Sequence, residues 1–282
     1  SYFSPDQEPV TLFYTGQTFV NSSSYQGRLK EITQMGVERI GDDSPEADAE
    51  LLAMTVEALL SCGLREFQVS VGQVDYFKSL LKEAGLEKEA EEHLRALISE
   101  KNYFGVEELV EEQKLCPQLA AVFQELPHLF GSVEVLKKAR SLTDNQSAVR
   151  AVERLERIYE LLKVYGYEKY ICFDFGMVSR IQYYTGIIFQ AYTYGTGEPL
   201  VKGGRYNELL KHFGAPAASV GFVIMADSLL TALSRQKIEI LPDEEPYVLT
   251  YTEETLEETL VKAQRLRKEG RSVSLRKKKE GL

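Results

Sequence analysis

Residues 74–164 have the periodicity of α-helix, and strand-like segments occur on both sides of them. Within this stretch apolar residues recur at spacings of three and four, and many Glu and Lys residues are four apart. We expect interruptions at Pro117 and Pro127, because proline breaks a helix interior. Since strand patterns resume after the stretch, we interpret residues 74–164 as a helical insertion into a domain built on a sheet.

The first strand-like segments predict a hairpin with a long connection. Residues 11–20 have strand character, residues 21–27 are rich in serine and predict a loop, and residues 28–41 predict a second strand. Residues 42–63 predict a helix that begins at Ser44 and Pro45 and ends at Gly63.

Further strands are predicted before and after the insertion. Residues 65–73 alternate as a strand, and strand character returns over residues 170–195. Residues 201–214 predict a glycine-rich turn that leads into a helix, and residues 219–233 are a further apolar segment. Because the connections are hairpins, we expect the sheet to be antiparallel.

The C-terminal part predicts a separate small unit. Residues 236–246 hold two prolines and an acidic run, which is typical of a linker. Residues 247–282 predict a strand, a helix and a strand, and this partial α/β unit would need more strands to bury both faces. The expected organisation is therefore a main domain over residues 1–235, a linker, and the partial unit.

Composition excludes several classes of function. The formal net charge is -10, from 43 acids and 33 bases, and such a field repels nucleic acid, so we interpret the terminal Arg276–Lys279 run as a solvated end. No apolar run approaches the ~18 residues of a membrane helix, and nothing resembles a signal peptide, so we expect a cytoplasmic protein. Neither a disulfide framework nor a metal site is expected, because the three cysteines, interpreted as buried thiols, lack CxxC spacing and the three histidines are scattered.

Four segments in order resemble the catalytic domain of histidyl-tRNA synthetases. They are QMGVERIG (34–41), YYTGIIFQAY (183–192), GGRYNELLKHFG (203–214) and VGFVIMADSLL (220–230). The resemblance spans residues 11–233. It implies an α+β fold of the class II synthetase type, an antiparallel sheet flanked by helices, with a histidine pocket on the sheet.

The resemblance implies seven residues for that pocket. A histidine ligand needs an anion for its ammonium group and oriented donors and acceptors for its ring. The implied histidine-binding residues are Gln34 and Glu38, which point toward the ligand amine, Tyr184 and Tyr206, which line the imidazole with Tyr183 beside them, and Gly203 and Gly204, which allow close backbone approach. Taken singly, each has a simpler interpretation as packing, a solvated strand residue or a turn.

The cations that adenylate formation requires are missing from the matching positions. The family has arginines at three places to stabilise phosphate charge, and here Val20, Ser179 and Ser228 stand in their stead. Arg180 is one residue displaced from the second place, which on a strand directs it to the opposite face. Arg205 is kept, but one arginine does not organise a triphosphate. We therefore expect no catalytic residues.

A histidine pocket without this machinery is similar to the regulatory subunits of ATP phosphoribosyltransferase. That resemblance implies a non-catalytic chain without a cofactor, which forms a homodimer and a hetero-oligomer with the short-form catalytic subunit, binds histidine, does not bind tRNA, and takes part in feedback on the first step of histidine biosynthesis. The family's leading helix and first dimer motif have no match in these 282 residues, so we expect part of the pocket and of the dimer interface to lie outside them.

Two other interpretations stay open. The chain could be a histidyl-tRNA synthetase with displaced arginines, in which case it would catalyse histidine-dependent and ATP-dependent pyrophosphate exchange. It could also be a synthetase-like scaffold that binds no ligand, in which case a complex would form without histidine binding.

Overall fold

A computed structural model describes residues 8–21, 30–178, 183–240 and 246–278. By its contacts the chain divides into two compact units, Ser1–Ile238 and Glu239–Leu282, and each is described by itself. The predicted linker over residues 236–246 contains this division, although residues 241–245 lie outside the described part of the chain.

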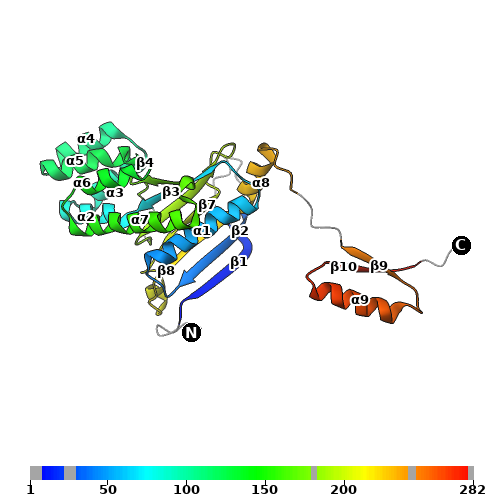
Figure 1. Ribbon diagram of the computed structural model, residues 1–282. Helices are drawn as coiled ribbons and strands as arrows, with labels where there is room; N and C mark the ends of the chain where they lie inside the picture. Colours follow the sequence, from blue (N-terminus) through cyan, green and yellow to red (C-terminus); the bar gives the residue numbers. More distant parts are fainter. Residues whose placement is uncertain (1–7, 22–29, 179–182, 241–245, 279–282) are drawn as a thin grey trace. The chain divides into compact units, whose positions relative to one another are not determined.

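The described residues of the first unit form an eight-stranded sheet in the order β1-β2-β8-β7-β6-β3-β5-β4 (Figure 1). The strands are β1 (Val10–Phe19), β2 (Glu31–Ile40), β3 (Phe67–Gln73), β4 (Phe130–Gly131), β5 (Ile171–Asp174), β6 (Ile187–Thr193), β7 (Val201–Arg205) and β8 (Ser219–Met225).

The sheet is mixed, which corrects the expectation of a wholly antiparallel one. Among the described strands every neighbouring pair is antiparallel except β3 and β5, which are parallel. The reason is the helical insertion between them, because a long crossover can return the chain beside β3 in the same direction, whereas a tight hairpin cannot. The predicted α+β class, a sheet flanked by helices, is confirmed.

The N-terminal hairpin and first helix follow the predicted pattern. Strands β1 and β2 pair antiparallel over their whole lengths. Helix α1 (Pro45–Ser61) begins after Ser44, whose hydroxyl accepts a hydrogen bond from the N–H of Ala47 at 3.1 Å. Proline suits the first helical position because it has no N–H to leave unpaired there.

The insertion is helical, as predicted, with two differences. It contains α2 (Val74–Ala84), α3 (Lys88–Ser99), α4 (Tyr103–Glu112), α5 (Pro117–Glu125), α6 (Glu134–Ser141) and α7 (Gln146–Tyr165). Pro117 begins α5 rather than interrupting a helix. Pro127 lies in a short 3-10 turn (Leu126–His128) that leads into the two-residue strand β4, which pattern analysis did not predict because it is too short to alternate.

Residues 170–195 are not one strand, and their two strands do not form a hairpin. Strand β3 pairs with both β5 and β6 and therefore lies between them. The chain must cross the end of β3 to pass from one to the other, and the described residues of this connection, 175–178 and 183–186, belong to no strand. Tyr183 and Tyr184 belong to this connection and immediately precede β6.

The glycine-rich segment was wrongly predicted as a turn at its start. Residues Val201–Arg205 form the central strand β7, which pairs with β6 and β8. Glycine has a low strand propensity, and the close approach of neighbouring aromatic rings that requires it here is a tertiary feature. A 3-10 helix (Leu210–Phe213) follows, and the last apolar segment divides into β8 and helix α8 (Ala226–Arg235).

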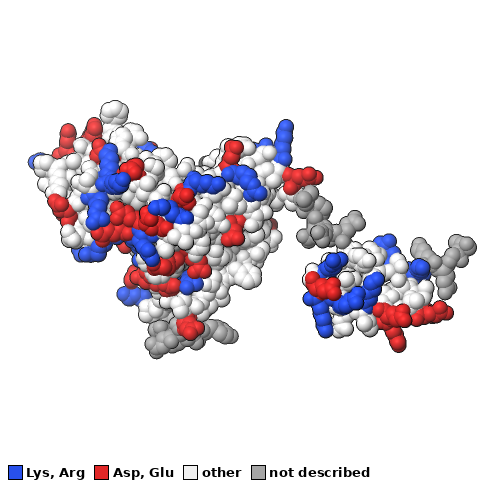
Figure 2. Space-filling model, in the orientation of Figure 1, with Lys and Arg blue, Asp and Glu red and all other residues white. Residues whose placement is uncertain are grey.

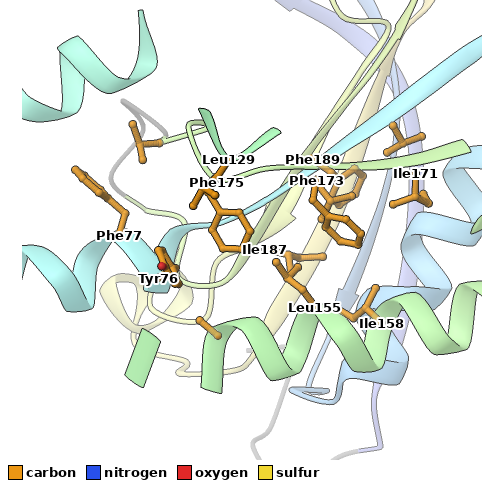
Figure 3. Packing of buried hydrophobic residues seen from close by; sticks show 14 of the residues in the cluster. Tyr76, Phe77, Leu129, Leu155, Ile158, Ile171, Phe173, Phe175, Ile187 and Phe189 are labelled. Carbon is orange, nitrogen blue, oxygen red and sulfur yellow. The ribbon is translucent and has the colours of Figure 1, made fainter. Parts of the chain in front are cut away.

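The core of the first unit lies between the sheet and its helices. Figure 3 shows Leu155 and Ile158 of α7 beside Ile187, Phe173 and Phe189 of the sheet, all of them buried. Helix α1 packs on the same face through buried residues such as Leu52 and Val56. The opposite face of the sheet is therefore the one available for a ligand.

The second unit has a strand, a helix and a strand. Strands β9 (Tyr247–Tyr251) and β10 (Val273–Lys277) pair in parallel, joined by α9 (Leu256–Lys268). Leu249, Ala263 and Leu266 form its small buried cluster. On the surface shown in Figure 2, Lys and Arg side chains are interspersed with Asp and Glu over both units.

Candidate functional site

A row of aligned residues that includes three glycines crosses the open face of the sheet. The strand register aligns Glu38 of β2 with Gly221 of β8, Gly221 with Gly204 of β7, and Gly204 with Ile188 of β6. The next partner in the row is Gly72 of β3. Because residues aligned in this way point to the same face, Gly221 and Gly204 leave a shallow bed between the side chains of Glu38 and Ile188.

Larger side chains lie over the glycines of this face. The ring of Tyr184 covers Gly204 so closely that a Cβ atom there would lie 2.6 Å from the ring. The carboxylate of Glu38 covers Gly221 in the same way, and the ring of Tyr14 from β1 covers Gly36. Glycine is required at these positions because any side chain would displace the groups above them.

Four of the residues predicted for the histidine pocket converge here. The hydroxyl of Tyr206 donates a hydrogen bond to the carboxylate of Glu38. The ring of Tyr183 is perpendicular to that of Tyr206, with centroids 6.0 Å apart, and its centroid lies 4.5 Å from that of Tyr184. We call Glu38, Tyr183, Tyr184 and Tyr206 the tyrosine cluster.

Burial sets the protonation of this cluster. It raises the pKa of Glu38, and the hydrogen bond from Tyr206 opposes that rise in part. Burial also raises the pKa of Tyr184 and Tyr206, so both hydroxyls keep their protons at neutral pH. The cluster therefore presents hydroxyl groups that can donate or accept and one carboxylate that accepts, a set that suits a neutral ring with one N–H and one bare nitrogen.

The other three predicted residues lie at the margins of the cluster. Gln34 projects from the same face of β2 as Glu38, four residues away, and its Nε2 atom lies 3.7 Å from the sulfur of Met225. Gly204 lies under Tyr184, as described above. Gly203 faces the core, where the ring of Phe189 covers it.

Two cavities flank the tyrosine cluster. The first, of about 690 Å³, lies between the sheet and the insertion and is lined by residues that include Tyr184, Gln190, Tyr192, Asp174, Lys101 and Phe130. The second, of about 590 Å³, is lined by residues that include Gln34, Val20, Glu198, Asp227 and Ser228. Glu38, Tyr183 and Tyr206 line neither cavity, and their side chains pack on one another.

Lys202 lines both cavities, and sequence reasoning missed it. It is exposed in the middle of β7, and within the described residues its ammonium group has no carboxylate partner. Its position two residues before Gly204 places it on the same face of the sheet. A single lysine inside an apolar and glycine-rich strand, VKGGR, is the sequence signal that could have revealed it.

An ion pair joins the insertion to the sheet at the first cavity. The Nζ atom of Lys101, which follows α3, lies 3.4 Å from the carboxylate of Asp174 at the end of β5. The N–H of Gly176 donates to the same carboxylate at 2.9 Å. Burial raises the pKa of Asp174, and the charge of Lys101 opposes it. Residues so distant in sequence carry no local signal of this contact.

The second cavity contains two of the positions where the family has arginines. Val20 and Ser228 line it. The third such position, Ser179, lies outside the described residues, as do the nearby Arg180 and Gln182. Its charged lining among the described residues is Glu198, Asp227 and Lys202, two acids and one base. A triphosphate requires several cations, so this described lining does not fit one.

Arg205 does not belong to the site. Its side chain is 1% exposed, lies 2.7 Å from the carboxylate of Asp48 on α1, and donates to the carbonyl of Asp42 at 2.9 Å. It faces the core because it is one residue beyond Gly204 on the strand. Its role in the structure is therefore to fasten β7 to α1.

Other chemistry is limited in the part of the chain that the structure describes. No group of three or more His, Cys, Asp or Glu side chains there could hold a metal ion. Of the three cysteines only Cys172 is buried, and the expectation of buried thiols is wrong for Cys62 and Cys116, which lie exposed at the ends of helices. None of the described helices combines the length and the apolar composition of a membrane span.

Comparisons with known proteins show which proteins this chain is similar to. The family model for histidyl-tRNA synthetase matches residues 2–229. The chain is 38% identical, over 95% of its length, to an ATP phosphoribosyltransferase regulatory subunit of Acetivibrio thermocellus and to another of Thermoanaerobacter pseudethanolicus, and it spans 64% and 70% of their lengths.

A solved structure is also similar. It is described as an ATP phosphoribosyltransferase regulatory subunit/histidyl-tRNA synthetase from Bacillus halodurans C, and it superposes with a TM-score of 0.74 at 32% identity. The match covers 96% of this chain and 69% of that one.

Proposed function

Because this chain belongs to the histidyl-tRNA synthetase family, among the ATP phosphoribosyltransferase regulatory subunits, we propose that it binds histidine as a non-catalytic regulatory subunit of that transferase. The observation that carries the proposal is the tyrosine cluster on the open face of the sheet, beside a cavity whose described lining lacks the cations of a nucleotide site.

The imidazole ring would lie at the tyrosine cluster. Glu38 would accept the ring N–H, in exchange for the hydrogen bond that it now receives from Tyr206, and a tyrosine hydroxyl would donate to the other ring nitrogen. This assignment moves Glu38 from the ligand amine, where the resemblance placed it, to the ring. The burial of Glu38 among hydroxyl groups supports its assignment to the ring, because a partly buried carboxylate needs hydrogen-bond donors of fixed geometry.

The amino-acid end of the ligand would point toward Gln34 and Lys202. Lys202 is two residues from Gly204 along β7, a separation of about 7 Å, which is comparable with the distance from the ring to the carboxylate in histidine. Within the described residues the ammonium group of Lys202 has no carboxylate partner, so it is the expected anchor for the ligand carboxylate. The side-chain carbonyl of Gln34 would accept from the ligand ammonium group.

The same arrangement supports a role without adenylation. Val20 and Ser228 present no charge to the second cavity, and Arg205 is held in the core by Asp48. Removal of one preorganised donor costs about 3 to 4 kcal/mol of transition-state stabilisation in enzymes, so loss of several leaves little catalysis. The chain would bind an amino acid and transmit its presence, without activating it or charging tRNA.

Regulation would follow from linkage with a partner. We place this chain in a hetero-oligomer with the short-form catalytic subunit, on the basis of the name that its relatives carry. Histidine inhibits such an assembly only if it binds the inhibited form more tightly than the active form, and the coupling is typically about 1 to 3 kcal/mol. A cytoplasmic location suits a subunit of a biosynthetic enzyme.

A second copy of the chain would lie along β1. This strand is at the edge of the sheet, and Phe13 and Phe19 on it are 86% and 76% exposed. Exposed apolar residues on an edge strand favour association with another chain. The homodimer that the resemblance implies would cover them, and the mass of the protein in solution tests it.

Calorimetry of the purified chain with histidine tests the proposal. Binding of histidine together with absence of histidine-dependent pyrophosphate exchange is the expected result. Exchange activity would identify a synthetase instead. A stable complex with the catalytic subunit in the absence of any histidine binding would identify a scaffold, and absence of both binding and complex would overturn the proposal.

A further inference from the structure

A groove separate from the tyrosine cluster lies between helices α2 and α7. Its volume is about 500 Å³, and α2 lines one side with Lys78, Ser79 and Lys82. Helix α7 lines the other side with Ser147, Arg150 and Arg154. No part of the function proposed above uses this groove.

The charge of the groove is unusual for this protein. Its lining holds four cations and one carboxylate, that of Asp75, in a chain with a formal net charge of -10. Lys78 and Lys82 are four residues apart on α2, and Arg150 and Arg154 are four apart on α7, so two like-charged pairs face one groove. Like charges at this spacing destabilise a helix by a few tenths of a kcal/mol, and a bound anion offsets that cost.

Two of the four cations are engaged elsewhere. The Nζ atom of Lys78 donates to the backbone carbonyl of Tyr184 at 2.7 Å. Arg154 donates to the carboxylate of Asp48 at 2.7 Å. These contacts hold the walls of the groove, because they fasten α2 to the connection that carries Tyr184 and α7 to α1.

The other two cations have no acidic partner within the described residues. Among the described residues Arg150 donates only to the hydroxyl of Ser147, at 3.0 Å, and Lys82 is exposed and contacts no carboxylate. Nearby acids are occupied: Glu83 accepts from the amide of Asn145, and Glu153 and Glu156 pair with Arg140. Within the described residues, the ammonium group of Lys82 and the remaining N–H groups of Arg150 are therefore available to a ligand in the groove.

We propose that this groove binds a phosphate-bearing small molecule. Arg150 supplies a forked donor that fits two phosphate oxygens, Lys82 supplies a point charge, and the hydroxyl group of Ser147, which accepts from Arg150, donates a further hydrogen bond. Cations on two facing helices suit a diphosphate better than a single phosphate. The strongly negative chain disfavours a long polyanion, which would extend beyond the groove.

Occupation of the groove would reach the tyrosine cluster through Lys78. An anion between the helices competes for the Lys78 ammonium group, which now holds the carbonyl of Tyr184. The ligand therefore favours release of that carbonyl. This link is a consequence of the proposed site, and the site itself stands whether or not the cluster binds histidine.

Calorimetric titration of the intact chain with inorganic pyrophosphate tests the site. The double variant Lys82→Gln/Arg150→Gln is expected to bind at least about tenfold more weakly than the wild type. The matched control is Lys262→Gln/Arg265→Gln on α9, which removes the same charge from exposed positions in the other unit and is expected to bind within about twofold of the wild type.

Three results would overturn the proposal. They are no binding of pyrophosphate by the wild type, equal binding by the groove variant and the wild type, and equal weakening in the control, which would show only a general effect of net charge. A fourth titration uses a short polyglutamate peptide. If the peptide binds through Lys82 and Arg150 and excludes pyrophosphate, the groove is a docking site for acidic protein segments and the proposal of a small phosphate ligand is wrong.

Discussion

The Nη2 atom of Arg205 lies 2.7 Å from the Oδ1 atom of Asp48, and both side chains are buried. The second oxygen of Asp48 accepts from Arg154 at 2.7 Å. The arginine that the family pattern retains thus forms a structural ion pair, which joins β7 to α1. It holds the strand that carries Gly204 and Lys202, and does so from the face opposite the site.

Replacement of this arginine is expected to destabilise the fold. Arg205→Leu leaves Asp48 with one guanidinium partner instead of two, and loss of one member of a buried ion pair costs about 3 to 5 kcal/mol. Urea denaturation measures the free energy of unfolding. Lys211→Leu, at an exposed position, is the control and is expected to change it by less than about 0.5 kcal/mol. A loss below about 1 kcal/mol for Arg205→Leu would contradict the structural role.

Glu38→Gln is expected to remove histidine binding and to stabilise the protein. Burial raises the pKa of Glu38, so the folded state disfavours its ionised form, and this penalty is present above the pKa of the folded state and absent well below that of the unfolded state. The variant should gain about 0.5 to 1 kcal/mol at pH 7 and nothing near pH 4.

Unfolding measured at both pH values, together with calorimetry, checks this expectation. Glu31→Gln, on the same strand and exposed, is the control. Histidine affinity equal to that of the wild type in Glu38→Gln would exclude the carboxylate from the ligand site, whatever the change in stability.

Gly204→Ala is expected to displace Tyr184. The added Cβ atom would lie 2.6 Å from the tyrosine ring and 2.7 Å from the carbonyl oxygen of Ile187, and such overpacking costs about 1 to 3 kcal/mol. Thermal unfolding and histidine calorimetry should both show the loss. Gly16→Ala is the matched control on a strand of the same sheet, since nothing lies within 4 Å of its Cβ position. If the two variants behave alike, the bed of glycines does not position the cluster.

Lys202→Gln is expected to weaken histidine binding by about tenfold or more, because it removes the proposed partner of the ligand carboxylate. Histamine, which has the same ring and amine but no carboxylate, should bind the variant and the wild type equally. Calorimetry with both ligands separates the two effects, and Lys211→Gln controls for net charge. Equal losses for histidine and histamine would show that Lys202 acts on the fold and not on the carboxylate.

Local pattern was sufficient for elements whose cause is local. Ser44 and Pro45 begin α1, because capping depends on a few consecutive residues. The insertion is helical because its apolar residues recur at the spacing of a helix. The cluster residues Glu38, Tyr184 and Tyr206 were identified through a resemblance, and the structure brings them together. Their ligand stays a prediction.

The sequence pattern gave wrong predictions where pairing between distant segments decides the structure. Residues 170–195 alternate throughout, yet β3 inserts between their two strands, and residues 201–205 form a strand whose glycines look like a turn. No single segment contains the information that β3 has one parallel and one antiparallel neighbour. Register also decided the roles of two neighbouring cations, since Lys202 faces the site and Arg205 faces the core.

The sequence by itself determined the class of fold, the helical insertion and, through a resemblance, the residues that come together in the tyrosine cluster. Only the tertiary structure decided which charges reach the site. Lys202 lines both cavities, Lys101 pairs with Asp174, and Arg205 forms a buried ion pair with Asp48. The physical reason is that helices and caps depend on neighbours in sequence, whereas the face that a strand residue presents depends on partners far along the chain.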